Sequence, residues 1–178
     1  MKYIGIDPGR NGAIAIIYNN GDDMLQTMNI FDIPLTSDKK KVDVNKLFHF
    51  LYSISDGKQV KCVLEKAQTM PGQGGVSNFS YGMTYGKTLS VLEILNIPFT
   101  EVHPMTWKKE FGILKSSKGM MKKDKKLLAL KKANELFPSM KKCFYTERGK
   151  LLDGRVEALL LAEFCKNFKT KRTKRGKK

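Results

Sequence analysis

Short apolar runs and helical patterns alternate along most of this 178-residue chain. Residues 2–7, 12–18 and 25–33 read as three successive strands, and a tight turn rich in glycine and proline joins the first two. This pattern predicts an antiparallel meander. A helix is expected to begin near Asp43 and to end at Gly57, because apolar residues recur there at helical spacing (Leu47, Phe48, Leu51 and Ile54).

The second half of the chain adds two strands and three helices. The apolar run 60–65 predicts a central, parallel strand, and residues 70–75 read as a loop. Further elements are expected as a helix from a Ser77 cap to about residue 96, a strand over 98–103, and helices over 122–137 and 153–168 with a polar connection after Pro138. The order βββαβαβαα predicts an α/β protein with a mixed five-stranded sheet flanked by helices, as in ribonuclease-H-like folds.

Composition limits the class of protein. The hydrophobic fraction of 41% and the charged fraction of 28% are those of a globular domain, which we place at residues 1–168. No apolar stretch approaches the roughly 20 residues that span a bilayer, and the strand pattern begins too early for a signal or transit peptide. Three scattered cysteines (Cys62, Cys143 and Cys165) suggest reduced thiols without a chemical role. A cytoplasmic location with no membrane partner is expected.

The charge of the chain points to a polyanionic partner. Its net charge is +16, and residues 108–142 carry twelve lysines against three acids. The segment from Lys166 to Lys178 adds eight basic residues and no acid, and we interpret residues 169–178 as a flexible basic tail. Nucleic acid fits this distribution better than a membrane surface, because the basic segments lack interleaved large apolar anchors.

Four carboxylates are placed where a divalent cation could use them. Asp7 and Glu65 each close an apolar strand, and Asp153 and Glu157 lie four residues apart on one helical face. Taken singly, Asp7 could form a turn and Asp153 could cap a helix. Together the four acids would repel one another without a cation, and Mg²⁺ is the natural ion for such oxygen ligands.

Several motifs, in order, resemble those of RuvC-type Holliday-junction resolvases. Residues 4–15 (IGIDPGRNGAIA) resemble the opening of that family, and residues 63–65 (VLE) with 68–74 (QTMPGQG) resemble the second acid motif. Later matches are Phe79, Gly82, Gly86, Ile97-Pro98, 102–104 (VHP), Trp107-Lys108, Lys123-Asp124, 136–138 (LFP) and 153–162 (DGRVEALLLA). The resemblance covers about residues 3–165 and is nearest to the phage-like and plastid-like branch.

The resemblance implies a crossover junction endodeoxyribonuclease. Such an enzyme is a homodimer that binds a four-way DNA junction and makes symmetric paired nicks, with two Mg²⁺ ions as cofactors and Mn²⁺ as a substitute. Asp7 is then expected to bridge both ions, with Glu65 and the pair Asp153 and Glu157 completing the ligands. The bacterial housekeeping branch spaces its last two acids three apart, so whether Asp153, Glu157 or both bind metal stays open.

The resemblance also implies residues that contact DNA. Gln73 is a candidate for hydrogen bonds to base edges, and Phe79 and Tyr81 are candidates for stacking on a base, with core packing or a dimer interface as the alternative. Lys108, Lys109, Lys122 and Lys123 are candidate contacts to the DNA backbone. Lys123, or its neighbour Lys122, is a further candidate for offsetting charge in the transition state.

Three other functions remain open at this point. An actin-like kinase or ATPase fragment opens with a similar strand and phosphate loop, but it needs a second domain and a nucleotide, and we expect no nucleotide cofactor. A noncatalytic junction-binding protein would be expected to have lost one of its acids. A related nuclease could act on other branched DNA or on RNA–DNA hybrids. His49 and His103 are expected to be structural, so no histidine-based triad competes.

Overall fold

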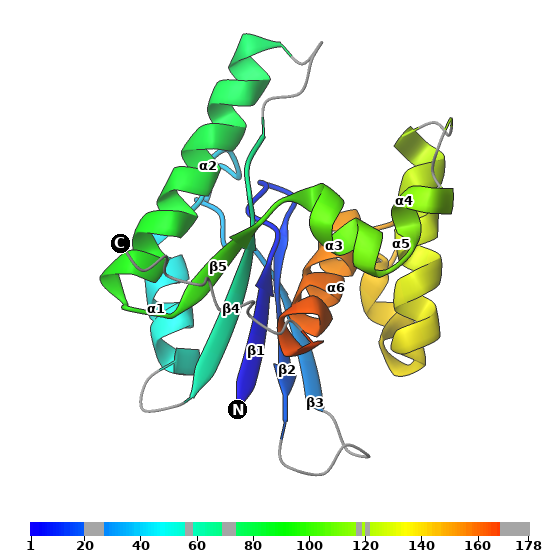
Figure 1. Ribbon diagram of the computed structural model, residues 1–178. Helices are drawn as coiled ribbons and strands as arrows, with labels where there is room; N and C mark the ends of the chain where they lie inside the picture. Colours follow the sequence, from blue (N-terminus) through cyan, green and yellow to red (C-terminus); the bar gives the residue numbers. More distant parts are fainter. Residues whose placement is uncertain (20–26, 56–58, 69–73, 117–118, 120–121, 168–178) are drawn as a thin grey trace, which may run out of the picture.

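The computed structural model describes residues 1–19, 27–55, 59–68, 74–116, 119 and 122–167. Five strands form one mixed sheet in the order β3-β2-β1-β4-β5 (Figure 1). Their bounds are β1 Lys2–Ile6, β2 Ala13–Tyr18, β3 Thr27–Asp32, β4 Val60–Glu65 and β5 Phe99–Val102. The first three strands pair antiparallel, whereas β4 runs parallel to both β1 and β5. The predicted meander and the central parallel strand are confirmed.

Helices cover both faces of the sheet (Figure 1). They are α1 Val44–Ser55, α2 Gly75–Ile94, α3 Pro104–Glu110, α4 Ile113–Ser116, α5 Lys122–Leu136 and α6 Asp153–Asn167, with a 3-10 helix η1 over Pro138–Phe144. Helices α1 and α2 pack against one face through a buried cluster that includes Leu47 and Leu92. Helix α6 lies on the other face, where the core also takes in Trp107 and Phe144. Strands β1, β2 and β4 are therefore buried on both sides, as their nearly continuous apolar runs predict.

The main chains of β1 and α6 approach one another very closely. A Cβ atom on Gly5 would lie 2.2 Å from the backbone nitrogen of Ala162 and 2.3 Å from the carbonyl oxygen of Ala158. At the start of α6, a Cβ atom on Gly154 would lie 2.2 Å from the carbonyl oxygen of Asn11. Only glycine fits at these two positions, which lets α6 lie directly on the sheet beside the turn that follows β1.

The structure differs from the sequence-based prediction in three places. Helices α3 and α4 and the 3-10 helix η1 lie where no helix was predicted, and Phe144 in η1 is fully buried rather than part of a polar connection. Helix α2 begins at Gly75, with Gly74 as its N-cap, so Ser77 lies inside the helix and does not cap it. The strand predicted over 25–33 ends at Asp32, one residue earlier than predicted, and its first two residues, 25 and 26, lie outside the described part of the chain.

Candidate active site

The four acids come from three elements that meet at one edge of the sheet. Ile6 on β1 pairs with Leu64 on β4, so Asp7 and Glu65, the next residue of each strand, lie at the same carboxyl edge. Asp153 and Glu157 occupy the first two turns of α6, which begins beside the turn after β1. The charges of Glu65, Glu157 and Asp153 all act on Asp7. The structure therefore brings together the acids that the sequence singles out.

The turn after β1 holds Asp7 in place. The backbone N–H of Asp7 donates to the carbonyl of Ala13 at 3.0 Å, and that of Gly12 donates to the carbonyl of Gly9 at 2.8 Å. One carboxylate oxygen, Oδ1 of Asp7, accepts a hydrogen bond of 3.3 Å from the N–H of Gly9. A Cβ atom on Gly12 would lie 2.1 Å from the carbonyl oxygen of Asp7, so this turn also requires glycine.

Burial, together with crowding of negative charge, raises the pKa of two of the acids. Burial, followed by the charges of Glu65 and Glu157, raises the pKa of Asp7 well above its ordinary value. Burial and the charge of Glu157 raise the pKa of Glu65 to about 7, although Lys108 and a hydrogen bond from Trp107 oppose the shift. Glu65 has only 5% of its surface exposed. A buried group of acids that repel one another in this way favours a cation.

Two lysines partly compensate this charge. The ammonium of Lys108 on α3 lies 2.9 Å from Oε1 of Glu157, and Lys126 on α5 forms a salt bridge with Asp153. Burial lowers the pKa of Lys108, but the charges of Glu157, Glu65 and Asp7 outweigh it, so that pKa is raised overall. Lys108 therefore stays protonated and lies among the acids.

The indole of Trp107 is hydrogen-bonded to Glu65. Its Nε1–H donates to Oε1 of Glu65 at 2.9 Å, and the tryptophan side chain is fully buried. The sequence marks Trp107 only as part of the family resemblance and assigns it no role. The strand order accounts for the contact: β5 pairs with β4, so the first turn after β5 lies near the end of β4.

The donor chemistry of the acids fits a divalent metal ion, although they are not gathered into a complete set of ligands. Within the described residues, which include all four acids, no three side chains of histidine, cysteine, aspartate or glutamate lie close enough to hold an ion as they stand. Lys108 and Lys126 are paired with Glu157 and Asp153 instead. Carboxylate oxygens on buried, mutually repelling groups are nevertheless the ligands that Mg²⁺ and Mn²⁺ prefer.

The candidate DNA-contacting residues are spread more widely. Phe79 on α2 has 70% of its surface exposed, whereas Tyr81 is partly buried and its ring lies near Gly9. Burial and the charges of Glu65 and Asp7 raise the pKa of Tyr81, so its hydroxyl stays protonated beside the acids. Lys109 is exposed. Gln73 lies outside the described residues, as do the side chains of Lys122 and Lys123, although α5 begins at Lys122.

Arg155, to which the sequence pattern assigned no role, anchors the side of α6 opposite to the acids. Its Nε and Nη2 donate to the two carboxylate oxygens of Asp32 at 2.6 and 2.7 Å, and its Nη1 donates to the carbonyl of Cys143 at 3.0 Å. Arg155 lies two residues from both Asp153 and Glu157, on the other side of the helix. The contacts join α6 to the end of β3 and to η1, which limits rotation of the helix that carries two acids.

The histidines have structural contacts. Nδ1 of His103 accepts from the backbone N–H of Met105 at 3.3 Å and so caps α3, while His49 on α1 meets the ring of Phe48 edge to face. Neither interaction places an imidazole among the acids, which agrees with the structural role expected for both residues.

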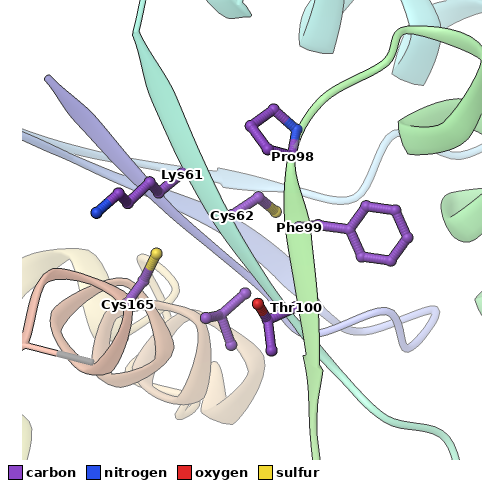
Figure 2. A pocket seen from close by; sticks show the side chains of 7 residues that line it. Lys61, Cys62, Pro98, Phe99, Thr100 and Cys165 are labelled. Carbon is purple, nitrogen blue, oxygen red and sulfur yellow. The ribbon is translucent and has the colours of Figure 1, made fainter. Parts of the chain in front are cut away.

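A separate hollow of about 200 Å³ is lined by residues of β4, of α6 and of the segment that begins β5 (Figure 2). It is lined by Lys61, Cys62, Val63, Pro98, Phe99, Thr100 and Cys165. Burial raises the pKa of Cys62 well above its ordinary value and that of Cys165 to about 12. Both thiols are therefore un-ionised at neutral pH and unreactive as nucleophiles, and the hollow adds nothing to the acid site.

Comparison of the whole chain with solved structures identifies the architecture. Thermus thermophilus RuvC in complex with a Holliday junction substrate superposes with a TM-score of 0.53, at 14% identity over 91% of this chain and 90% of that one. A second structure of T. thermophilus RuvC gives a TM-score of 0.54, at 15% identity over 94% and 96% of the two chains. The chain has the RuvC fold.

The RuvC fold extends over nearly the whole length of both chains, which confirms the predicted ribonuclease-H-like architecture. No protein-family model and no curated protein sequence matches the chain. The likeness therefore lies in the fold. Among the described residues, no helix is long and apolar enough to cross a membrane.

Proposed function

We propose that this chain is a divalent-metal-dependent endonuclease that resolves four-way DNA junctions by paired, symmetric nicks. The observation that carries the proposal is the meeting of Asp7, Glu65, Asp153 and Glu157 at one edge of a sheet with the RuvC fold. The net charge of +16 favours a nucleic-acid substrate. One of the RuvC structures that supports the proposal was solved with a Holliday junction.

Asp7 and Glu65 would hold the metal together with Glu157, Asp153 or both. When bound, two divalent ions lower the pKa of an attacking water and stabilise the leaving 3′-oxygen. Asp7 is the most central ligand, because the charges of the other three acids all act on it. Either Mg²⁺ or Mn²⁺ suits such a set of oxygen donors.

Two other side chains of the site are suited to the phosphate that is cut. Lys108 carries a positive charge held by Glu157, and a cation bound by that acid would free the ammonium to contact a phosphate oxygen. The hydroxyl of Tyr81 stays protonated beside Glu65 and Asp7, so it is available as a hydrogen-bond donor. Lys122 and Lys123 lie at the start of α5, the helix whose Lys126 pairs with Asp153, which keeps them candidates for contacts to the DNA.

We propose further that the active form is a homodimer assembled through α2. The first turns of this helix project beyond the carboxyl ends of β1 and β4 (Figure 1). Its outer face exposes 87% of Val76, 70% of Phe79 and 38% of Met83. A Cβ atom on Gly82 or Gly86 would have nothing within 4 Å among the described residues, so this side of α2 has room for a close neighbour.

A second copy of the same chain is the occupant that best fits this face. Each chain carries one set of four acids, whereas two symmetric nicks require two sets related by a two-fold axis. Glycines four residues apart share a helical face and permit a second helix to approach closely. Gly82→Leu is expected to convert a dimer into monomers in sedimentation velocity, whereas Tyr52→Ala, which removes an exposed ring from α1, should leave the dimer intact. An intact dimer in Gly82→Leu would exclude this interface.

The function is tested by a cleavage assay on a four-way junction with a mobile core. Each strand is labelled in turn, and linear duplex and an RNA–DNA hybrid serve as control substrates, in Mg²⁺ and in EDTA. Paired nicks at symmetric positions that disappear in EDTA are the expected result. Tight junction binding without cleavage would instead indicate a noncatalytic binding protein, and cleavage confined to the hybrid would indicate a different nuclease of the same architecture.

A further inference from the structure

We propose that Trp107 is a positioning residue for Glu65: its indole N–H fixes one carboxylate oxygen, so that Glu65 is held ready to bind a divalent cation. The inference rests on the proposed function, because it takes Glu65 as a metal ligand. The hydrogen bond from Nε1 to Oε1 of Glu65 measures 2.9 Å and joins residues 42 apart in the sequence. Trp107 is 0% exposed and Glu65 5% exposed, so water competes little for the bond.

The neighbouring structure holds the indole in a fixed place. Val102 at the end of β5 pairs with Glu65, and its carbonyl accepts from the N–H of Lys66 at 2.9 Å. Helix α3 then starts at once, with His103 as its N-cap and proline as its first residue. Trp107 packs in the same core cluster as the buried residues of α6. Its ring meets that of Phe111 edge to face, with 6.4 Å between the ring centroids. The donor therefore reaches Glu65 from a rigid element.

The indole of Trp107 and the two lysines differ in how much negative charge they leave on the acids for a metal ion. The ammonium of Lys108 neutralises Glu157, and a cation that uses Glu157 must compete with that charge. The indole carries no charge, so it orients Glu65 without reducing the negative charge that attracts an ion. Outer partners of this kind set the orientation of metal ligands, and removing one typically weakens metal binding by about 10–100-fold.

The test removes the N–H and keeps the ring. Trp107 is the one tryptophan in the sequence, so growth on a tryptophan analogue changes this position alone. β-(3-benzothienyl)alanine replaces the N–H by sulfur, whereas 4-fluorotryptophan retains it and serves as the matched control. Binding of Mn²⁺ is measured from the electron paramagnetic resonance signal of the free ion, which needs neither tryptophan fluorescence nor cleavage activity.

The benzothienyl protein is expected to bind Mn²⁺ about 10-fold or more weakly than the fluorotryptophan protein. Affinities within twofold of one another would overturn the inference. A variant with a purely structural defect, Phe144→Leu, loses volume from the same core cluster and should lower the melting temperature without changing Mn²⁺ affinity. A change of Mn²⁺ affinity in Phe144→Leu equal to that of the benzothienyl protein would likewise count against a specific role for the N–H.

The same titrations separate this inference from the proposed function. If Mn²⁺ binds in an Asp7-dependent manner and the benzothienyl protein binds it weakly, the role of Trp107 stands even when no junction is cut, and only the proposed activity fails. If the intact protein shows no Asp7-dependent binding of Mn²⁺, the role of Trp107 and the metal-dependent mechanism both fail.

Discussion

Lys108 donates a hydrogen bond of 2.9 Å to Glu157, and so places a positive charge inside the group of acids. The two residues lie on α3 and α6, and their side chains are 25% and 20% exposed. In the absence of metal this ion pair is the main compensation for the charge on Glu157. Lys109, the next residue of the same helix, is exposed and provides a matched comparison.

Replacing Lys108 by methionine is therefore expected to destabilise the metal-free protein by about 1–2 kcal/mol, because the carboxylate of Glu157 loses its partner. Urea denaturation in EDTA measures the effect, and Lys109→Met should remain within about 0.5 kcal/mol of the parent protein. Added Mg²⁺ should reduce the deficit of Lys108→Met, since an ion that binds the folded state stabilises it. Equal losses of stability in Lys108→Met and Lys109→Met would contradict a special role for Lys108.

Asp7→Asn should abolish junction cleavage while retaining or tightening junction binding. The substitution removes a carboxylate that we propose as a metal ligand, and also a charge that repels DNA. We expect the cleavage rate to fall by at least about 1,000-fold, which corresponds to about 4 kcal/mol in the barrier. Single-turnover cleavage and a gel-shift titration measure the two effects. Asp38→Asn, in a loop outside the site, is the control, and parallel loss of binding and folding in Asp7→Asn would indicate a structural role.

The metal-free protein should lose stability as the pH rises from about 4.5 to about 7. The pKa of Glu65 is raised from 4.5 in an unperturbed glutamate to about 7 in the folded chain, so the folded state binds the extra proton in this interval. The contribution of Glu65 is at most about 3 kcal/mol, present below pH 4.5 and lost above pH 7. Urea denaturation in EDTA at pH 5 and pH 8 gives the difference. Glu65→Gln should reduce this difference in stability, although part of it should remain because the pKa of Asp7 is also raised. An unchanged difference would contradict the contribution of Glu65.

Deletion of residues 169–178 should weaken DNA binding to a similar extent for junctions and for linear duplex. The segment contains seven of the 33 basic residues and no acid, so it is expected to bind phosphates without reading sequence or shape. The dependence of log affinity on log salt concentration should become less steep, by about 0.9 for each phosphate that the shortened chain leaves unneutralised. A weakening confined to junctions would show that the segment takes part in recognition of the branch.

Gly154→Ala should destabilise the fold by about 1–3 kcal/mol, because its Cβ would meet the backbone of the turn after β1. Thermal unfolding measures the change, and Gly75→Ala is the control, since a Cβ atom there would have nothing within 4 Å. An equal loss of stability in Gly75→Ala would mean that any replacement of a helical glycine by alanine has this effect, and that the close approach at Gly154 is not its cause.

The strands and most helices could be predicted because their signals are local. Apolar runs mark β1, β2 and β4, and the predicted acids follow β1 and close β4. Helices α3 and α4 were missed because they span only seven and four residues, too short to establish a helical period. The 3-10 helix η1 was missed for a similar reason, although Phe144 gave a hint of burial within a polar stretch.

The acids of the site could be predicted, but their partners could not. Asp7 and Glu65 end predictable strands, and Asp153 and Glu157 share a predictable helical face. The pairing of Lys126 with Asp153 and of Trp107 with Glu65 depends on how α5 and α3 pack, which no local pattern encodes. The pairing of Lys108 with Glu157 could not be predicted either, because a lysine-rich segment gives no indication of which ammonium turns inward.

The glycine at position 5 has a consequence for how this protein can change. Where Gly5 faces Ala158 and Ala162, the main chains of β1 and α6 approach each other with no side chain between them. Main-chain atoms are the same whatever the residue type. The spacing between the strand that leads to Asp7 and the helix that carries Glu157 therefore does not depend on which apolar side chains fill the rest of the core. Core residues can be exchanged over evolution while the reacting groups keep their separation, so sequence drift and preservation of the site are compatible in this architecture.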